Sequence, residues 1–292
     1  MEIIDGKACS LSLLNQLKPI ITLFQKKHSR KPSLKIIRVS DDFASIIYTE
    51  NKIKVAESIG ISAEIVVLPK DIKSEELTKV IMSLNEDDQT DGIIMQLPLP
   101  GHLSKERLLN EISPEKDVDG ITALNMGSLI QGSPLFVPCT PQGIMRLIKH
   151  IGLDLKGLNA VILGQSLIVG RPVAMCLLNS GATVTICHRA TKDLEAKIKS
   201  ADVLVSAMGA PGVVSAQWIK PGATVFDVGI NRSEANKIIG DIEYDQCKHV
   251  GFITPVPGGI GPMTVACLQF NTVLAALTRV NDKTLLDELS LI

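Results

Sequence analysis

The sequence of 292 residues predicts an α/β fold made of two domains, each built on a parallel sheet. Short, nearly continuous apolar runs alternate with helical patterns, as they do when helices cover both faces of a parallel sheet. The alternation pauses at Pro138-Cys139-Thr140-Pro141 and then starts again. The length also corresponds to about two domains of roughly 150 residues each.

Apolar runs and helical periodicity define the elements of the first domain. The runs predict strands at 34–39, 63–68 and 92–97, and the periodic segments between them predict helices at 44–59 and 74–85. This strand-helix order is the pattern of a parallel sheet.

The second domain is predicted to begin with a helix that Thr140 caps and that Pro141 starts. A last helix is expected from about Pro262 to Val280. Between them the sequence predicts strands at 160–163, 183–186, 202–205, 224–228 and 252–253, and helices from 170 and at 192–199.

Composition excludes several classes of protein. Thirty basic and 31 acidic residues leave a net charge of -1, and aromatic residues make up only 3%, so neither nucleic acid nor a membrane surface is an expected partner. No uninterrupted apolar run is long enough for a spanning helix, and no signal peptide is expected. The six cysteines form no C-x-x-C pair, which predicts reduced thiols, a cytoplasmic protein and no metal site.

A glycine-rich turn follows the strand that is expected at 160–163. Gly164, Ser166 and Gly170 give the spacing G-x-S-x-x-x-G just before a helix, a place where a dinucleotide pyrophosphate can bind helix N–H groups. The usual fingerprint is G-x-G-x-x-G, so a plain tight turn stays an alternative.

The end of the next strand favours NADP over NAD. Residues 185–191 hold no acidic side chain that could bind a ribose 2′-hydroxyl group, whereas Arg189 can bind a 2′-phosphate with paired hydrogen bonds. The alternative is a solvent-exposed arginine.

Polar side chains in the first domain are candidates for chemistry. Tyr48 and Lys52 are four residues apart on one helix, and a lysine in apolar surroundings has a lowered pKa. Gln96 lies at the carboxyl end of the strand that is expected at 92–97, at the sheet edge where ligands of α/β proteins bind. Asp119 lies beside a turn glycine, and Gly258 and Gly259 lie in a rigid loop rich in proline. Ordinary surface or turn roles are the alternatives.

Together these segments resemble the bifunctional methylenetetrahydrofolate dehydrogenase/methenyltetrahydrofolate cyclohydrolase family over nearly the whole chain. The motifs that carry the resemblance are Ser45-x-x-Tyr48-x-x-x-Lys52, Asp91-Gly92 through Gln96-Leu97-Pro98-Leu99-Pro100, Lys116-Asp117-Val118-Asp119-Gly120, Pro138-Cys139-Thr140-Pro141, Gly164-x-Ser166-x-x-x-Gly170-x-Pro172, Asp227-Val228-Gly229-Ile230-Asn231 and Pro255-Val256-Pro257-Gly258-Gly259-x-Gly261-Pro262-Met263-Thr264.

The resemblance implies oxidation of 5,10-methylenetetrahydrofolate with NADP, followed by hydrolysis to 10-formyltetrahydrofolate, in one cleft between the domains. It implies a folate-binding catalytic domain at 1–139 with 270–292, an NADP-binding Rossmann domain at 140–269, and a homodimer. The implied catalytic residue is Lys52, whose proton transfer Gln96 tunes by a hydrogen bond. Asp119 is implied to bind the pterin, Tyr48 to stack on it, and Gly258 and Gly259 to border the folate. The implied cofactor-binding residues are Gly164, Gln165, Ser166, Arg189 and, through its backbone, Ile230.

The sequence departs from the family pattern in three places, one of which is Phe43, where a proline is common before the Ser45 motif. Gln165 stands where many relatives have an arginine, so cofactor preference depends more on Arg189. Residues 121–124 differ from the segment that usually follows the Asp119 turn. Two other functions stay open at this point: a related dehydrogenase that acts on another small substrate, and a dinucleotide sensor without activity.

Overall fold

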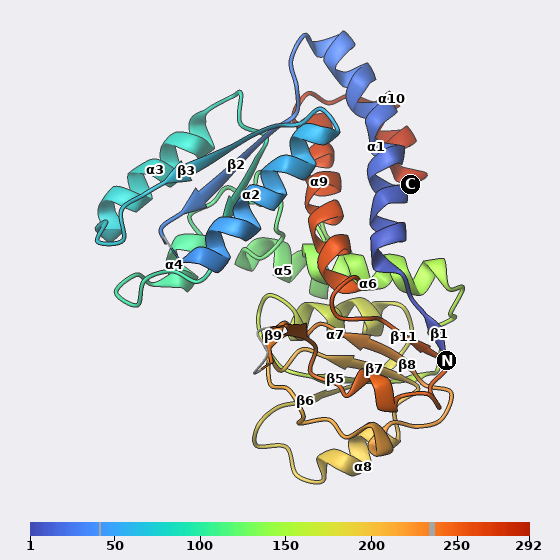
Figure 1. The fold of residues 1–292 in the computed structure, drawn as a ribbon. Helices are drawn as coiled ribbons and strands as arrows, with labels where there is room; N and C mark the ends of the chain where they lie inside the picture. The colour runs from blue at the N-terminus through green and yellow to red at the C-terminus, as the bar shows by residue number, and fades with distance from the viewer. Residues whose placement is uncertain (41, 234–236) are drawn as a thin grey trace. The chain divides into compact units, whose positions relative to one another are not determined.

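The computed structural model describes residues 1–40, 42–233 and 237–292, and Figure 1 shows their fold. The chain divides into two compact units. The three-stranded unit comprises Leu11–Cys139 and Val265–Ile292, and the six-stranded unit comprises Met1–Ser10 and Thr140–Thr264. The predicted α/β class with parallel sheets is confirmed in both units.

This division differs from the expected domains at residues 1–10 and 265–269. The expected domains are 1–139 with 270–292, and 140–269. The first ten residues instead join the six-stranded unit, because β1 (Glu2–Ile3) pairs in parallel with β11 (Phe252–Ile253). A strand of two residues leaves no periodicity that a sequence could show.

The three-stranded sheet has the order β3-β2-β4, with every strand parallel to its neighbour. It consists of β2 (Ser33–Arg38), β3 (Ser62–Val67) and β4 (Gly92–Met95). Every residue of β4 is buried, whereas the edge strand β3 is partly exposed. The strand expected at 92–97 therefore ends two residues early, and Gln96 is the first residue beyond its carboxyl end.

Two predicted helices follow the first two strands of this sheet. The helices that were expected at 44–59 and 74–85 are confirmed as α2 (Phe43–Ser58) and α3 (Ser74–Glu86). The Asp42 carboxylate caps α2 by accepting a hydrogen bond from Ser45 N at 3.0 Å. The unit also contains α4 (Lys105–Leu109), α5 (Ala123–Ile130), α10 (Lys283–Ser290) and most of α1 (Gly6–His28), which the sequence did not predict.

The six-stranded sheet is entirely parallel, with the order β1-β11-β8-β7-β5-β6. Two of its central strands are fully buried and mainly apolar, with polar residues at their ends. Besides β1 and β11, it contains β5 (Asn159–Leu163), β6 (Thr183–Cys187), β7 (Val203–Ser206) and β8 (Thr224–Asp227). The helices α6 (Cys139–His150), α7 (Gly170–Asn179) and α8 (Leu194–Lys199) accompany it, together with a separate hairpin of β9 (Asn231–Arg232) and β10 (Ile238–Ile239).

Helix α9 (Ile260–Arg279) is long and apolar enough by composition to cross a membrane. It is the one such helix in the described parts of the chain, and 67% of its most apolar window is buried inside the protein. The helix is therefore a core helix, and its apolar character comes from packing. The sequence placed its start near Pro262, two residues later than the structure does.

Candidate active site

Lys52 and Gln96 meet at the carboxyl end of the three-stranded sheet. Lys52 Nζ on α2 donates a hydrogen bond to Gln96 Oε1 at 2.9 Å. Gln96 Nε2 donates to Leu97 O at 2.8 Å, and the Gln96 N–H donates to Ile37 O on β2 at 2.8 Å. The bond from Nε2 to Leu97 O orients the amide so that its oxygen faces the lysine.

The surroundings of Lys52 favour loss of its proton. Burial is the largest effect and lowers the pKa of the ammonium group, while the charge of Asp119 opposes this by favouring the charged form. The net result is a lysine whose pKa is below its ordinary value. Such an amine can both accept and donate a proton closer to neutral pH.

Asp119 lies on a turn that Asp117 organises. The buried carboxylate of Asp117 accepts hydrogen bonds from Gly120 N at 3.0 Å, Thr122 N at 2.8 Å and Asn125 Nδ2 at 2.8 Å. These three bonds fix the backbone on both sides of the turn. The half-buried Asp119 is thereby presented toward Lys52, on whose pKa it acts.

A second set of contacts holds the same turn from α9. The buried side chain of Asn271 donates from Nδ2 to Val118 O at 2.9 Å and to Val137 O at 3.1 Å. The Cys139 thiol also donates to Val118 O, at 3.3 Å, and burial, reinforced by the charge of Asp119, raises the pKa of that thiol well above its usual value. Cys139 is therefore a neutral thiol in this site.

Tyr48 lies on α2, one turn before Lys52. The residue is 41% exposed, so part of it is open to a ligand. The structure thus brings together four of the candidate residues, Tyr48, Lys52, Gln96 and Asp119, in the three-stranded unit.

The glycine-rich turn lies in the six-stranded unit, between β5 and α7. Gly164 has a φ of +120°, and a Cβ atom there would meet Ala207 O at 2.4 Å. Ser166 Oγ accepts hydrogen bonds from Val169 N at 3.2 Å and Gly170 N at 3.3 Å. Its hydroxyl proton stays available to a phosphate oxygen, and Gln165 and Ser166 are both exposed.

Arg189 lies at the same edge of the sheet as this turn. Strands β5 and β6 pair in parallel with Leu163 opposite Cys187, and Gly164 N donates to Cys187 O at 2.9 Å. Arg189 follows the end of β6 and is exposed. Arg189 and the glycine-rich turn therefore both follow strand ends at the carboxyl edge of the sheet, where dinucleotides bind.

The remaining candidates also belong to the six-stranded unit. Ile230, which follows β8, is 55% exposed. Gly258 O accepts a hydrogen bond from Lys7 N at 2.9 Å, and Gly259 packs so closely that a Cβ atom on Gly6 would lie 1.8 Å from its oxygen. These glycines hold the N-terminus against the loop. The expected cleft between the domains stays a prediction.

The described residues contain no cluster of three or more histidine, cysteine or acidic side chains that could hold a metal ion. Sequence reasoning overlooked Asp117, Asn125 and Asn271 as supports of the Asp119 turn. Asp117 stands two residues before Asp119, but only the fold shows that its carboxylate points back into the turn.

Two family models cover most of the chain. The catalytic domain of tetrahydrofolate dehydrogenase/cyclohydrolase matches residues 4–119, and the NAD(P)-binding domain of the same family matches residues 138–280. The first match contains all four candidates of the three-stranded unit. The second contains the glycine-rich turn and Arg189.

Solved structures agree over nearly the whole length. The bifunctional methylenetetrahydrofolate dehydrogenase/cyclohydrolase from Campylobacter jejuni is 44% identical, with a TM-score of 0.93 over 96% of this chain and 99% of that one. A 5,10-methylenetetrahydrofolate dehydrogenase from the silkworm Bombyx mori is 41% identical, with a TM-score of 0.90 over 96% of this chain and 99% of that one. The Trypanosoma brucei dehydrogenase-cyclohydrolase, solved with NADP and an inhibitor, is 36% identical, with a TM-score of 0.91 over 95% and 98%. The chain therefore belongs to the tetrahydrofolate dehydrogenase/cyclohydrolase family and is a bifunctional enzyme of one-carbon folate metabolism.

Proposed function

We propose that the enzyme oxidises 5,10-methylenetetrahydrofolate by hydride transfer to NADP and then hydrolyses the methenyl product to 10-formyltetrahydrofolate. The observation that carries the second step is the 2.9 Å hydrogen bond between Lys52 Nζ and Gln96 Oε1. Hydride transfer alone has no use for a lysine with a lowered pKa. Hydrolysis needs a proton acceptor that can later return the proton.

Lys52 supplies this proton transfer. Loss of hydride leaves a methenyl carbon that is cationic and open to attack by water. Lys52 Nζ takes one proton from the attacking water and gives it to the folate nitrogen that leaves as the ring opens. The second water proton leaves to solvent as the hydroxyl group becomes the formyl C=O. Gln96 Oε1 accepts one N–H of Lys52 in either protonation state, so the lone pair of the neutral amine can face the substrate.

Asp119, Tyr48 and two glycines bind the folate in this proposal. The carboxylate of Asp119 matches two adjacent N–H donors on the pterin, and the Asp117 turn fixes its direction. The exposed ring of Tyr48 stacks on the flat pterin. Gly258 and Gly259 border the folate with backbone alone.

The dinucleotide is NADP in this proposal. Its role is to accept the hydride. The close backbone approach at Gly164 leaves no room for a side chain, and the free proton of Ser166 suits a pyrophosphate oxygen; Gln165 flanks it. Arg189 binds the 2′-phosphate, and the Ile230 backbone binds the nicotinamide amide. The relative from T. brucei, solved with NADP, supports this choice.

We also propose a cytoplasmic homodimer. All six cysteines are free, which suits a reducing compartment. The family resemblance supports the dimer, and a mass twice that of the chain in light scattering would test it.

An absorbance assay tests the proposed function. The protein is mixed with 5,10-methylenetetrahydrofolate and either NADP or NAD, and the reduced cofactor and the methenyl compound are both followed. Reduced cofactor that forms while methenyl stays low is the expected result, with NADP preferred. Accumulating methenyl would contradict an active hydrolase step. No turnover by folded protein would point to another substrate or to a sensor.

A further inference from the structure

Two buried carboxylates lie at the carboxyl edge of the six-stranded sheet. Asp227 ends β8, and Asp241 follows β10; they are 4% and 1% exposed. Asp227 Oδ1 accepts hydrogen bonds from Gly229 N at 2.9 Å and Asp241 N at 3.0 Å, and its Oδ2 accepts from Ile242 N at 3.0 Å. These bonds hold the backbone of two segments, the one that follows β8 and the one that follows β10.

Asp241 gathers a second set of donors. Its Oδ2 accepts from Ser206 Oγ at 3.0 Å and Met208 N at 2.9 Å, and its Oδ1 accepts from Ala210 N at 3.0 Å and Asn231 Nδ2 at 2.9 Å. One carboxylate thus ties the segment after β7 to the segment after β8. Burial raises the pKa of Asp227 to about 6, against the effect of its backbone hydrogen bonds, so it is mostly ionised at neutral pH.

Each carboxylate also fits against a glycine in the segment that carries the other one. A Cβ atom on Gly229 would lie 2.2 Å from Asp241 Oδ1, and a Cβ atom on Gly240 would lie 2.0 Å from Asp227 Oδ2. Gly229 is two residues beyond Asp227, and Gly240 is next to Asp241. The two segments therefore interlock, with no space for a side chain at either glycine.

Ile230, whose backbone binds the nicotinamide amide in our proposed function, lies within these interlocked segments. Ile230 lies between Gly229, which Asp227 binds, and Asn231, which Asp241 binds. Strands β7 and β8 pair with Ser206 opposite Asp227, so the segment from Met208 to Ala210 ends at the same edge. That edge is where dinucleotides bind in such sheets.

We propose that Asp241 and Asp227 are positioning residues for hydride transfer, which hold the Ile230 backbone where it binds the nicotinamide amide. The inference rests on the proposed function. Neither carboxylate touches the substrate; both act through the loop. A small displacement of a reacting group can reduce a rate by about a hundredfold.

Asp241→Asn tests this role, because the amide places N–H groups against backbone donors. We expect kcat for NADP reduction to fall by about tenfold to a hundredfold. Hydrolysis of supplied methenyltetrahydrofolate, measured without a dinucleotide, stays unchanged. The inhibition constant of adenosine 2′,5′-bisphosphate, which lacks nicotinamide, also stays unchanged. Asp202→Asn is the matched control, since Asp202 accepts from Asn159 N at the opposite edge of the sheet, and it alters none of the three.

Other outcomes overturn the inference. An Asp241→Asn enzyme with wild-type NADP reduction would show that the carboxylate positions nothing. Equal losses of reduction, hydrolysis and bisphosphate binding would show a merely structural role. If this variant does not fold, Ser206→Ala removes a single donor, and we expect a loss of about fivefold in reduction alone. Failure of the wild type to reduce NADP would instead contradict the proposed function.

Discussion

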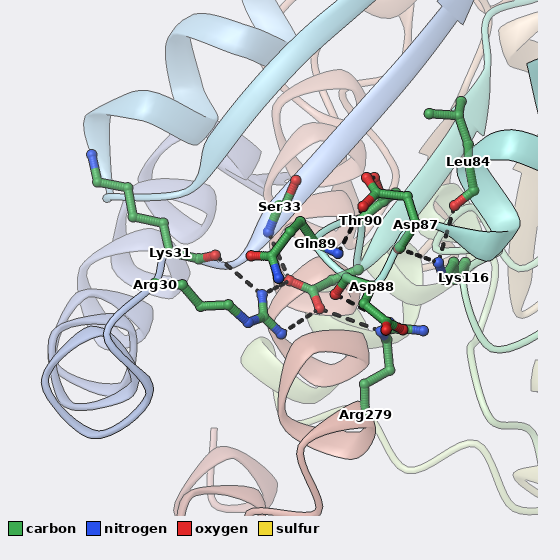
Figure 2. A network of polar contacts seen from close by, with 11 residues as sticks. Arg30, Lys31, Ser33, Leu84, Asp87, Asp88, Gln89, Thr90, Lys116 and Arg279 are labelled. Atoms are coloured by element: carbon green, nitrogen blue, oxygen red, sulfur yellow. Dashed lines mark hydrogen bonds and ion pairs between the residues drawn. The ribbon is translucent and has the colours of Figure 1, made fainter.

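Arg30 binds Asp91 through both of its terminal nitrogens, with Nη1 2.7 Å from Oδ2 and Nη2 2.8 Å from Oδ1. Asp91 is fully buried just before β4, and Arg30 lies just beyond α1. Figure 2 shows Arg30, from the segment just after α1, and Arg279, on α9, pointing toward the same region, with Ser33 beside it. Ser33 N donates to Asp91 Oδ2 at 2.9 Å, and Arg279 Nε lies 3.5 Å from Oδ1.

This network holds α1 and α9 to the amino end of the three-stranded sheet, opposite the edge that carries Gln96. Arg30→Ala would leave a buried carboxylate with only one backbone donor and a more distant arginine. We expect the free energy of unfolding to fall by about 3 kcal/mol, at the lower end for a broken buried pair. Urea denaturation measures this. Arg107→Ala, which removes an exposed pair with Glu111, is the control and costs about 0.5 kcal/mol or less. Equal losses for both would contradict the account.

Asp282 makes the free energy of unfolding depend on pH in the acid range. Hydrogen bonds from Lys27 at 2.7 Å and His28 at 2.9 Å lower the pKa of its carboxyl group to about 2 in the folded chain. The unfolded value is about 3.9, so the stabilisation is present above that pH and is lost as pH falls toward 2. Asp282→Asn keeps the cap of α10 but removes the charge. We expect a loss of about 1 kcal/mol at neutral pH, because Lys27 is exposed, and no loss near pH 2. A loss that persists in acid would show that the charge is not responsible.

Arg189→Ala tests the cofactor proposal. Only NADP carries the 2′-phosphate, and a charge-assisted hydrogen bond contributes about 1.5–3 kcal/mol, so we expect KM for NADP to rise at least about tenfold. KM for NAD stays the same. The control is Lys199→Ala, which removes an exposed cation paired with Glu195 on α8 and changes neither constant. A similar rise for both dinucleotides would mean that Arg189 does not distinguish them.

The hydrogen-bonded pair of Lys52 and Gln96 could be predicted from the sequence, because local features of the chain determine where both residues lie. Tyr48 and Lys52 share a helix face by their spacing, and Gln96 follows a buried apolar strand that must end at the ligand-binding edge. The glycine-rich turn was predictable for the same reason. Its departure from the usual spacing is explained by Ser166, whose hydroxyl accepts the N–H groups that open α7.

The supports of the site could not be predicted, because they join residues far apart in the chain. Asn271 is 153 positions from the carbonyl of Val118 that it binds. Asn125 directly follows residues 121–124, which depart from the family pattern, and its amide completes the Asp117 turn. Likewise β1 becomes a strand only because β11 is beside it. Such contacts depend on tertiary packing, which periodicity does not describe.

The most direct test of the account is the effect of Lys52→Met on the two activities. Met keeps the length and apolar contacts of the side chain but cannot transfer a proton. We expect hydrolysis of methenyltetrahydrofolate to be abolished while the variant still folds and binds NADP. Lys54→Met, an exposed lysine on the same helix, keeps both activities. If Lys52→Met hydrolyses the methenyl compound at the wild-type rate, Lys52 is not the proton-transfer group, and the account of the site is contradicted.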